Sequence, residues 1–341
     1  MTFANVTLFL AMVVLAFVLT WRLTGRIRTY ALAKNLVDDV NERSSHSVPT
    51  PRGGGLAIIA VVLPAVALAS LIGEIPGPMA RGLLGAGTLV VLIGWIDDLG
   101  HVSPQVRLAA HTGAAALLAF FINPFPLDWI GVSYVWLEWP FTLVMTVWLI
   151  NLFNFMDGID GIAGSEAIFV FGGYAVLGTV IGQNSGFLAP ALLLVAATAG
   201  FLIWNWQPAR IFMGDAGSGF LGLMLAVAAV AGAKTSTAFG VAMLILPAAF
   251  VADATVTVLR RAIVGAPVFE AHRSHAYQIA ARRRGNHAVV TIASVAINLF
   301  FLLPVAALVA TMILSPLAGM VIAYLPLMTA AWLYGAGDPE A

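Results

Sequence analysis

Residues 212–233 read FMGDAGSGFLGLMLAVAAVAGA, a glycine-rich head with one acid, Asp215, that runs directly into an apolar stretch. Apolar runs suited to crossing a hydrocarbon core of roughly 30 Å recur along the whole chain, separated by short polar connections. The chain is 61% hydrophobic and only 9% charged, whereas about a quarter of the residues are charged in soluble domains. The sequence therefore predicts an all-α, polytopic membrane protein.

Eleven apolar windows predict eleven transmembrane helices, and no segment between them is as long as a soluble domain. Residues 1–341 are therefore expected to form a single membrane domain. The predicted spans lie near residues 3–21, 54–72, 82–96, 108–122, 140–153, 164–182, 187–204, 218–233, 238–258, 289–312 and 317–335.

Basic residues are distributed unevenly over the connections between these spans. Of the sixteen Lys and Arg residues, all except Arg81 and Lys234 lie in segments that follow odd-numbered spans. Lys and Arg in short loops are retained in the cytoplasm. The distribution predicts an N-terminus outside the cell and a C-terminus in the cytoplasm.

Five polar segments follow odd-numbered spans, so their side chains are expected on the cytoplasmic face. In the first, Arg43, His46 and Arg52 precede three glycines, 53–55, that open the second span. Glycines and a helix N-terminus let a phosphate approach backbone N–H groups, which predicts a site for an anionic headgroup. A basic loop that only obeys the positive-inside rule is an equally good interpretation.

The second and third segments carry acids. Adjacent Asp97 and Asp98 repel each other unless a cation or proton lies between them, which favours a metal or acid–base role over a simple helix-end turn. Asn154, Asp157 and Asp160 recur every three residues, so they would share one face if the segment were helical. Their oxygen atoms suit a hard cation. Capping of the next helix is the alternative for one of the two acids.

The fourth and fifth segments resemble phosphate sites. Asp215, among glycines at a helix start, could hold a metal-bound diphosphate, although the Lys-Ser/Thr of a P-loop is absent. His272, Arg273 and His275 can donate hydrogen bonds to anionic oxygens. The basic run 282–284 fits a surface helix that touches anionic lipid. The chain has no cysteine, and its carboxylates favour magnesium over zinc.

With these motifs in order along the chain, the sequence resembles the polyprenyl-phosphate N-acetylhexosamine-1-phosphate transferases, membrane enzymes that begin bacterial cell-envelope glycans. The resemblance rests on Asp97-Asp98, on the Asn-x-x-Asn-x-x-Asp-Gly-x-Asp-Gly run from Asn151, on Phe-Met-Gly-Asp from Phe212 and on the histidine-containing loop after the ninth span. It covers essentially the whole chain, and it implies the same eleven-span topology.

The resemblance also implies roles for individual residues. It places Mg²⁺, with Mn²⁺ as a substitute, on Asp215, Asn154 and Asp157. The other expected positions follow by role: catalytic Asp97, Asp98, Asp157 and Asp160; uracil contacts Asn205 and Phe212; donor-diphosphate contacts His272, Arg273 and His275; further substrate contacts Arg43, His46 and Arg52.

The implied reaction moves a sugar-1-phosphate from a UDP-N-acetylhexosamine to undecaprenyl phosphate in the bacterial inner membrane, and releases UMP. Three consecutive histidines, found in the phospho-MurNAc-pentapeptide transferases, are replaced here by His272-Arg-Ser-His275, which points to the subgroup that begins O-antigen chains. The expected partners are these two substrates and membrane lipid, without nucleic acid, and a homodimer is compatible with the resemblance. The rival interpretation is a secondary transporter, whose polar site would lie near the bilayer midplane.

Overall fold

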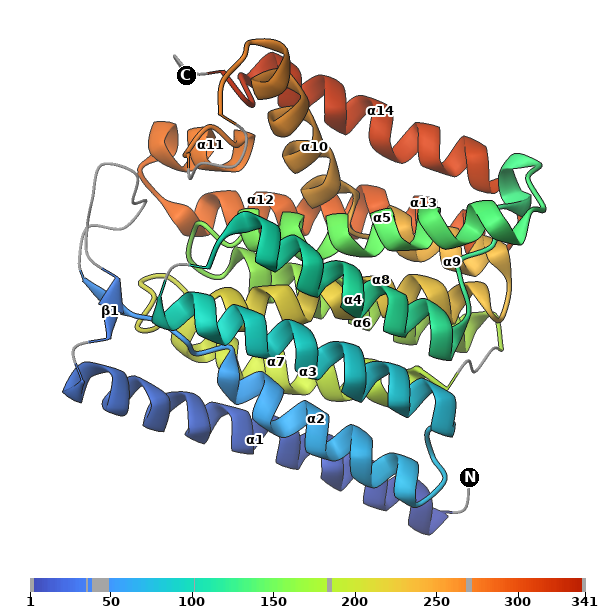
Figure 1. Cartoon of the computed structure of the whole chain (residues 1–341), viewed down its shortest axis with the longest axis horizontal. Helices are drawn as coiled ribbons and strands as arrows, with labels where there is room; N and C mark the ends of the chain where they lie inside the picture. The colour runs from blue at the N-terminus through green and yellow to red at the C-terminus, as the bar shows by residue number, and fades with distance from the viewer. Residues whose placement is uncertain are drawn as a thin grey trace.

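The structure is a computed structural model that describes residues 3–34, 36–38, 49–100, 102–182, 186–267 and 272–338. Within these ranges almost every ordered element is a helix, so the all-α prediction is confirmed. The one exception is a two-residue antiparallel pair in which Val37 is opposite Pro51 and Asp38 is opposite Thr50. Most of the helices run side by side along the long axis of the molecule (Figure 1).

The elements follow one another in this order: α1 (Phe3–Ala33), β1 (Val37–Asp38), β2 (Thr50–Pro51), α2 (Leu56–Leu71), α3 (Gly77–Leu99), α4 (Pro104–Ile122), η1 (Asp128–Ile130), α5 (Val135–Phe155), α6 (Ile162–Val180), α7 (Leu188–Asn205), α8 (Asp215–Ala233), α9 (Thr237–Ile245), α10 (Ala248–Ile263), α11 (Ala276–Arg284), α12 (His287–Ile297), η2 (Asn298–Leu302), α13 (Leu303–Ala310) and α14 (Pro316–Tyr334).

Helix α8 is the centre of the bundle, and every residue of its apolar window is buried by neighbouring helices. Small residues allow the close packing. A Cβ on Gly222 would lie 2.6 Å from the carbonyl oxygen of Leu149 in α5, and a Cβ on Gly94 in α3 would lie 2.6 Å from the Cα of Ala216. These glycines bring α3, α5 and α8 together next to the start of α8, where the polar residues lie.

Nine helices in the described part of the chain are long and apolar enough to cross a membrane, and the bent pair α9–α10 makes a tenth. Helix α2, with 16 residues, is about 24 Å long and is the shortest of the predicted spans. The eleven predicted windows therefore each correspond to one helix or to two or three consecutive helices. Their ends differ: α1 continues twelve residues past Trp21, because an apolar window detects only the lipid-facing part of a helix.

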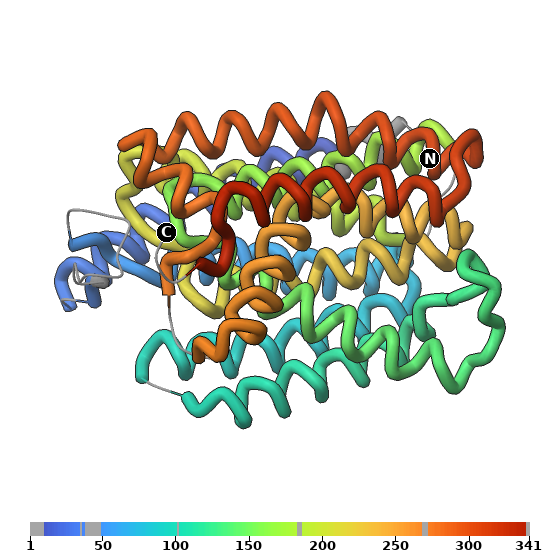
Figure 2. The backbone as a smooth tube through the Cα atoms, turned by 90° about the horizontal axis from the view of Figure 1, so that it is seen from above, coloured from blue at the N-terminus to red at the C-terminus, as the bar shows by residue number. Residues whose placement is uncertain are grey.

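Helix α10 departs from the common direction. It is bent by 66° from α9 at a break of two residues, Leu246 and Pro247. Figure 2 shows α10 crossing the bundle at a steep angle toward the end that carries the C-terminus. The bend brings Asp253, which is buried, to the polar end of the molecule.

Helix α1 begins and helix α14 ends at opposite ends of the bundle (Figures 1 and 2). The connections α3–α4, α5–α6, α7–α8 and α10–α11 all lie at the end that holds the C-terminus (Figure 1). The prediction that the polar segments gather on one face is thus confirmed for the described residues. Which face is cytoplasmic remains a prediction from the basic residues.

Cysteine labelling can test this orientation without background, because the chain contains no cysteine. Ser103, Asn286 and Ser133 are exposed, the first two at the polar end and the third in the connection at the opposite end. We expect a membrane-impermeant maleimide to label Ser133→Cys in intact cells, and to label Ser103→Cys and Asn286→Cys only after the membrane is opened. Labelling of Asn286→Cys in intact cells would reverse the assigned orientation.

Candidate active site

The polar end of the bundle brings four of the five predicted segments into contact, and part of the first joins them. Arg52 is exposed and donates from Nη2 to the carbonyl oxygen of Asp98 at 2.7 Å. The expected substrate contacts Arg43 and His46 lie outside the described residues. The first segment therefore reaches the site through Arg52, and its other two predicted residues stay predictions.

Asp98 holds the start of α8. Its two carboxylate oxygens accept the backbone N–H groups of Asp215 at 3.0 Å and Ala216 at 3.2 Å. The first N–H groups of a helix have no partner within the helix, and a carboxylate there is favoured by the helix dipole. Asp98 thus supplies a cap from another helix, which fixes Asp215 at the mouth of the bundle. Such a carboxylate is poorly placed to act as a general base.

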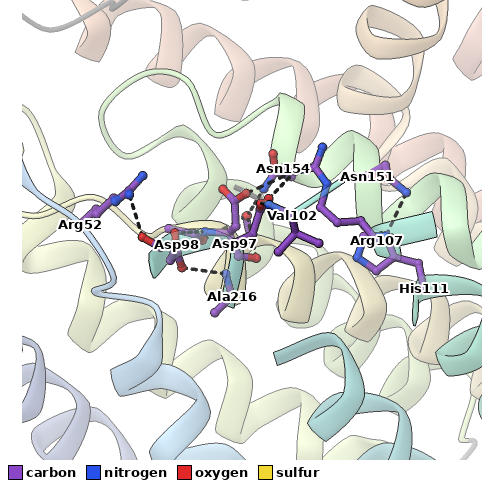
Figure 3. Close-up of polar contacts among 12 residues, drawn as sticks. Arg52, Asp97, Asp98, Val102, Arg107, His111, Asn151, Asn154 and Ala216 are labelled. Atoms are coloured by element: carbon purple, nitrogen blue, oxygen red, sulfur yellow. Dashed lines mark hydrogen bonds and ion pairs between the residues drawn. The ribbon is translucent and has the colours of Figure 1, made fainter. Parts of the chain in front are cut away.

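Asp97, Arg107 and Asp215 form a compact charged group, of which Figure 3 labels Asp97 and Arg107. Nη1 of Arg107 lies 2.5 Å from Oδ2 of Asp97 and 3.7 Å from Oδ2 of Asp215. Asp97 also accepts the N–H of Val102 at 2.8 Å, and its carboxylate reaches that of Asp215. Only 8% of the Asp97 side chain is exposed, against 38% for Asp215. Asp215 is therefore the acid that an incoming ligand would meet.

The third segment is not one helical face, so the predicted ladder is wrong in that form. Helix α5 ends at Phe155, and Gly161 adopts a φ of +74° before α6 begins. Asn154, in the last turn of α5, contacts the Asp215 carboxylate and donates to Oγ of Ser218 at 3.1 Å. Asp157 follows in the connection, facing the same group of acids.

Burial, and then the negative charges of Asp215, Asp98 and Asp160, raise the pKa of the Asp157 carboxyl well above its usual range. The three neighbouring acids all oppose ionisation of Asp157, so these carboxylates repel one another. A bound cation would remove this repulsion. Bringing these acids together therefore costs free energy.

Asp160 lies to one side of that group and acts on other elements. Its Oδ2 accepts the N–H of Ala209 at 3.0 Å, its Oδ1 lies 3.3 Å from Nδ1 of His287, and its carbonyl oxygen accepts the hydroxyl of Thr291 at 3.0 Å. These contacts join the α5–α6 connection to the α7–α8 connection and to α12. The geometry indicates a positioning role, and the predicted catalytic role has no support from these contacts.

The fourth segment is held by its own backbone and by Asn205. The Asn205 amide accepts the N–H of Gly161 at 3.1 Å and donates to the carbonyl of Ile211 at 3.0 Å. It is 2% exposed, so its amide is committed inside the protein. Phe212 is partly exposed and remains available for the predicted contact with uracil.

The glycines of the first segment serve packing. The N–H groups of Gly54 and Gly55 donate to the carbonyls of Phe212 and Met213, both at 2.9 Å. A Cβ on Gly55 would lie 2.5 Å from the Cα of Gly217. The prediction that these two N–H groups bind phosphate is therefore wrong, because they pair with the segment that leads into α8.

The fifth segment is organised by Asp253 of α10. Its carboxylate accepts the N–H groups of Ala276 at 3.0 Å and Tyr277 at 2.9 Å, which are the first two residues of α11. Its Oδ1 also lies 3.3 Å from Nδ1 of His275 and 3.1 Å from the hydroxyl of Thr257. Asp253 therefore fixes the start of α11 and the orientation of His275.

The two histidines of this segment have different environments. His275 is 2% exposed, and its ring stacks on that of His272 at a centroid distance of 5.0 Å. Burial, followed by the charges of His275 and Arg261, lowers the pKa of His272 to about 4. His272 is thus neutral at neutral pH and can donate a hydrogen bond but no charge. Arg273 is exposed and supplies the positive charge among the three residues predicted to contact the donor diphosphate.

Tyr277 connects this segment to the acids. Its hydroxyl donates to the carbonyl of Phe155 at 2.8 Å, and burial, together with the charges of Asp253 and Asp157, raises the pKa of the phenol well above its usual value. It therefore remains a donor throughout the physiological range. A Cβ on Gly158 would lie only 2.2 Å from that hydroxyl, so the glycine is required for the contact.

Sequence reasoning missed several residues of the site. Arg107 was counted only as a topology signal, although it is the one basic residue that follows the acidic pair within the same connection. Three more residues lie inside or next to the fourth and fifth polar segments, but no sequence spacing distinguishes them: Tyr277, Ser218 and His287. Asp253 lies within the ninth predicted span, 238–258, and its role as a cap depends on the bend between α9 and α10.

A divalent cation fits the donor chemistry of the group formed by Asp97, Asp215 and Asn154. Within the described residues no three His, Asp or Glu side chains converge as a closed metal site. Mg²⁺ does not require one, because it commonly binds through one or two carboxylates, several waters and the phosphates of a substrate. The two carboxylates in contact and the half-exposed Asp215 meet that requirement.

A helical membrane bundle that gathers acids, arginines and histidines at one mouth fits an enzyme that handles anionic substrates at the membrane surface. Residues 80–233 match the model of glycosyl transferase family 4. These residues include α8 and most of the acids described above.

Curated relatives agree with this match. The chain is 30% identical to the probable undecaprenyl-phosphate N-acetylglucosaminyl 1-phosphate transferase of Bacillus subtilis, with 74% of this chain and 72% of that protein covered. It is 34% identical to the decaprenyl-phosphate N-acetylglucosaminephosphotransferase of Mycolicibacterium smegmatis (66% and 61%). It is 31% identical to the phospho-N-acetylmuramoyl-pentapeptide-transferase of Synechococcus elongatus (53% of each).

The chain therefore belongs to glycosyl transferase family 4, the polyprenyl-phosphate sugar-1-phosphate transferases. The family resemblance derived from the motifs is confirmed. The family membership argues against the secondary transporter. The position of the acids, at one mouth of the bundle and not near its middle, argues against it as well.

The contact between Tyr277 and the α5–α6 connection can be tested by adding a single methyl group. Gly158→Ala should displace the Tyr277 hydroxyl and lower turnover at least tenfold, because the added Cβ cannot coexist with that hydroxyl. Tyr277→Phe in the same chain removes the clashing oxygen and should restore part of the lost turnover. Gly172→Ala is a matched control, because its Cβ would meet nothing within 4 Å. Equal turnover in Gly158→Ala and Gly172→Ala would contradict the coupling.

Proposed function

We propose that the protein transfers an N-acetylhexosamine-1-phosphate from a UDP-sugar to undecaprenyl phosphate and releases UMP. The observation that carries the proposal is the group of Asp97, Arg107 and Asp215 at the mouth of the bundle, where a membrane-bound phosphate and a water-soluble diphosphate can meet. The names of two relatives, which specify N-acetylglucosamine and a polyprenyl phosphate, support the same substrate classes.

The proposed chemistry is a phosphoryl transfer. An oxygen of the lipid phosphate forms a bond to the sugar-linked phosphorus of the donor, and the bond from that phosphorus to the bridging oxygen breaks, so that UMP leaves. The lipid phosphate is largely dianionic at neutral pH if its second pKa is near 6, as in phosphorylated side chains. It needs no general base. Positioning and neutralisation of charge are the main tasks of the protein.

Each residue of the site has a part in these tasks. Mg²⁺, when bound by Asp215 and Asn154 with Asp157 nearby, would neutralise the donor diphosphate. Arg107 is the cation beside Asp97 and Asp215 and would offset the charge of a phosphate bound there. Arg273 and the neutral His272 would donate hydrogen bonds to the donor, and the ring of Phe212 would stack on uracil.

The proposed cellular place is the cytoplasmic face of a bacterial inner membrane, at the first membrane step of O-antigen or a related cell-envelope glycan. The basic connections at the polar end support the face. The replacement of a histidine triplet by His272-Arg-Ser-His275 supports a donor without a peptide.

A panel of donors tests this function directly. Purified protein with undecaprenyl phosphate and Mg²⁺ should release UMP from UDP-N-acetylhexosamines at least a hundredfold faster than from UDP-glucose or UDP-MurNAc-pentapeptide. The lipid product should carry one sugar and two phosphates by mass spectrometry. Release of UDP in place of UMP would show a different bond cleavage and would overturn the proposal.

The charged group can be tested through Arg107 and Asp215. Arg107→Ala should lower kcat by roughly a hundredfold, in line with removal of a group that stabilises transition-state charge, and Arg107→Lys should recover part of it. Asp215→Asn should abolish transfer and should weaken Mn²⁺ binding measured by electron paramagnetic resonance. Arg284→Ala is the control, since Arg284 is exposed and outside the group. Wild-type Mn²⁺ affinity in Asp215→Asn would place the cation elsewhere.

A further inference from the structure

A second buried acid lies inside the membrane part of the bundle, apart from the active site. Glu166, in the second turn of α6, is 1% exposed, and Asn298, the first residue of η2, is fully buried. Asn298 is the twelfth residue of the 24-residue span His287–Ala310, so it lies at the middle of that span. An ionisable side chain at such a depth is costly and calls for a specific partner.

The contact between the two side chains leaves two oxygen atoms without a donor. Nδ2 of Asn298 donates to Oε2 of Glu166 at 2.5 Å. Oε1 of Glu166 and Oδ1 of Asn298, both buried, have no hydrogen-bond partner among the described residues. The carboxyl group of Glu166 and the amide group of Asn298 are thus joined by one hydrogen bond, and the remaining oxygen of each group has no donor. One proton on Oε1 would supply the missing donor for both.

The other polar group near Glu166 is already engaged. Tyr324 of α14 interacts electrostatically with Glu166, but its hydroxyl donates to the carbonyl of Leu244 in α9 at 2.6 Å. Its proton is therefore not available to Oε1. In the described part of the chain, no Lys, Arg or His forms an ion pair with Glu166 at 4 Å or less.

We propose that Glu166 and Asn298 form an intramembrane proton-binding site, in which Glu166 is a neutral acid that donates from Oε1 to Oδ1 of Asn298. The two hydrogen bonds close a ring of the kind that a carboxylic acid and an amide form in an apolar medium. A neutral acid avoids the cost of a buried carboxylate, and the ring satisfies every polar atom of both side chains.

The site fastens α6 to the α12–α13 span within the membrane. The α12–α13 span also contacts the connection that precedes α6, where Thr291 and His287 contact Asp160. The π-helical turn η2 begins at Asn298, and such turns are frequent at functional sites. The bound proton thus holds the helix that follows the Asp157–Gly161 connection at a fixed depth.

Substitutions distinguish a bound proton from other occupants, with the thermal unfolding midpoint of the purified protein in detergent as the readout. Glu166→Gln replaces the acid O–H by an amide N–H and should keep the wild-type midpoint and transfer rate. Glu166→Leu should lower the midpoint by several degrees, since it leaves the Asn298 amide unpaired. Glu74→Gln, at an exposed position, controls for loss of a carboxylate.

A reversed pair gives a second test. Asn298→Asp alone places two acids in contact and should lower the midpoint. Combined with Glu166→Gln, it restores one acid and one amide with the same side-chain lengths, and the midpoint should return toward that of the wild type. If the double variant is no more stable than Asn298→Asp alone, the acid–amide pair is wrong.

Infrared spectra and salt dependence identify the occupant. The wild type should show the carbonyl band of a neutral carboxylic acid that is absent from Glu166→Gln. Its midpoint should be the same in sodium chloride as in choline chloride at equal concentration. A missing band, or a midpoint that rises only with sodium and is lost in Glu166→Gln, would replace the proton by a bound water or a sodium ion and would overturn the proposal.

Discussion

The site depends on the two hydrogen bonds that the Asp98 carboxylate accepts from the first two N–H groups of α8. They join the end of α3 to the start of the central helix, and the absence of a side chain on Gly94 lets the two helices approach closely enough. Because α8 begins at Asp215, this cap fixes both the position and the outward direction of the acid that a ligand meets. The helix dipole strengthens the contact.

The acids around this cap differ in how their charge is balanced. Asp98 is balanced by helix N–H groups and by the nearby Arg52, and Asp97 by Arg107 and a backbone N–H. Asp215 has only the more distant Arg107 and the Asn154 amide, and Asp157 is opposed by its neighbours. The unbalanced charge therefore lies on the side open to ligand. Under the proposed function, a cation bound here would offset this charge and favour the approach of an anionic diphosphate.

Periodicity and composition predicted the helical bundle, its spans and the gathering of polar segments at one end, because these follow from length, apolarity and the order of the chain. Contacts across the bundle could not be predicted in the same way. Gly54 and Gly55 fit a phosphate loop by sequence, yet their N–H groups face Phe212 and Met213. Asn154, Asp157 and Asp160 have helical spacing, yet α5 ends at Phe155, before the two acids. Arg107 needed the fold to bring it beside Asp215.

Asp253 and Glu166 show how partners decide the chemistry of a buried acid. Asp253 receives two backbone N–H groups, a threonine hydroxyl and a histidine ring, which together replace the hydration of a carboxylate and suit an ionised cap. Glu166 receives one amide N–H at Oε2, and its Oε1 has no hydrogen-bond partner among the described residues, which suits a neutral acid. The two residues have similar burial, so exposure alone does not separate them. The number and kind of hydrogen-bond donors around each acid separates them. An ionised carboxylate can only accept hydrogen bonds, whereas a protonated acid must also donate one.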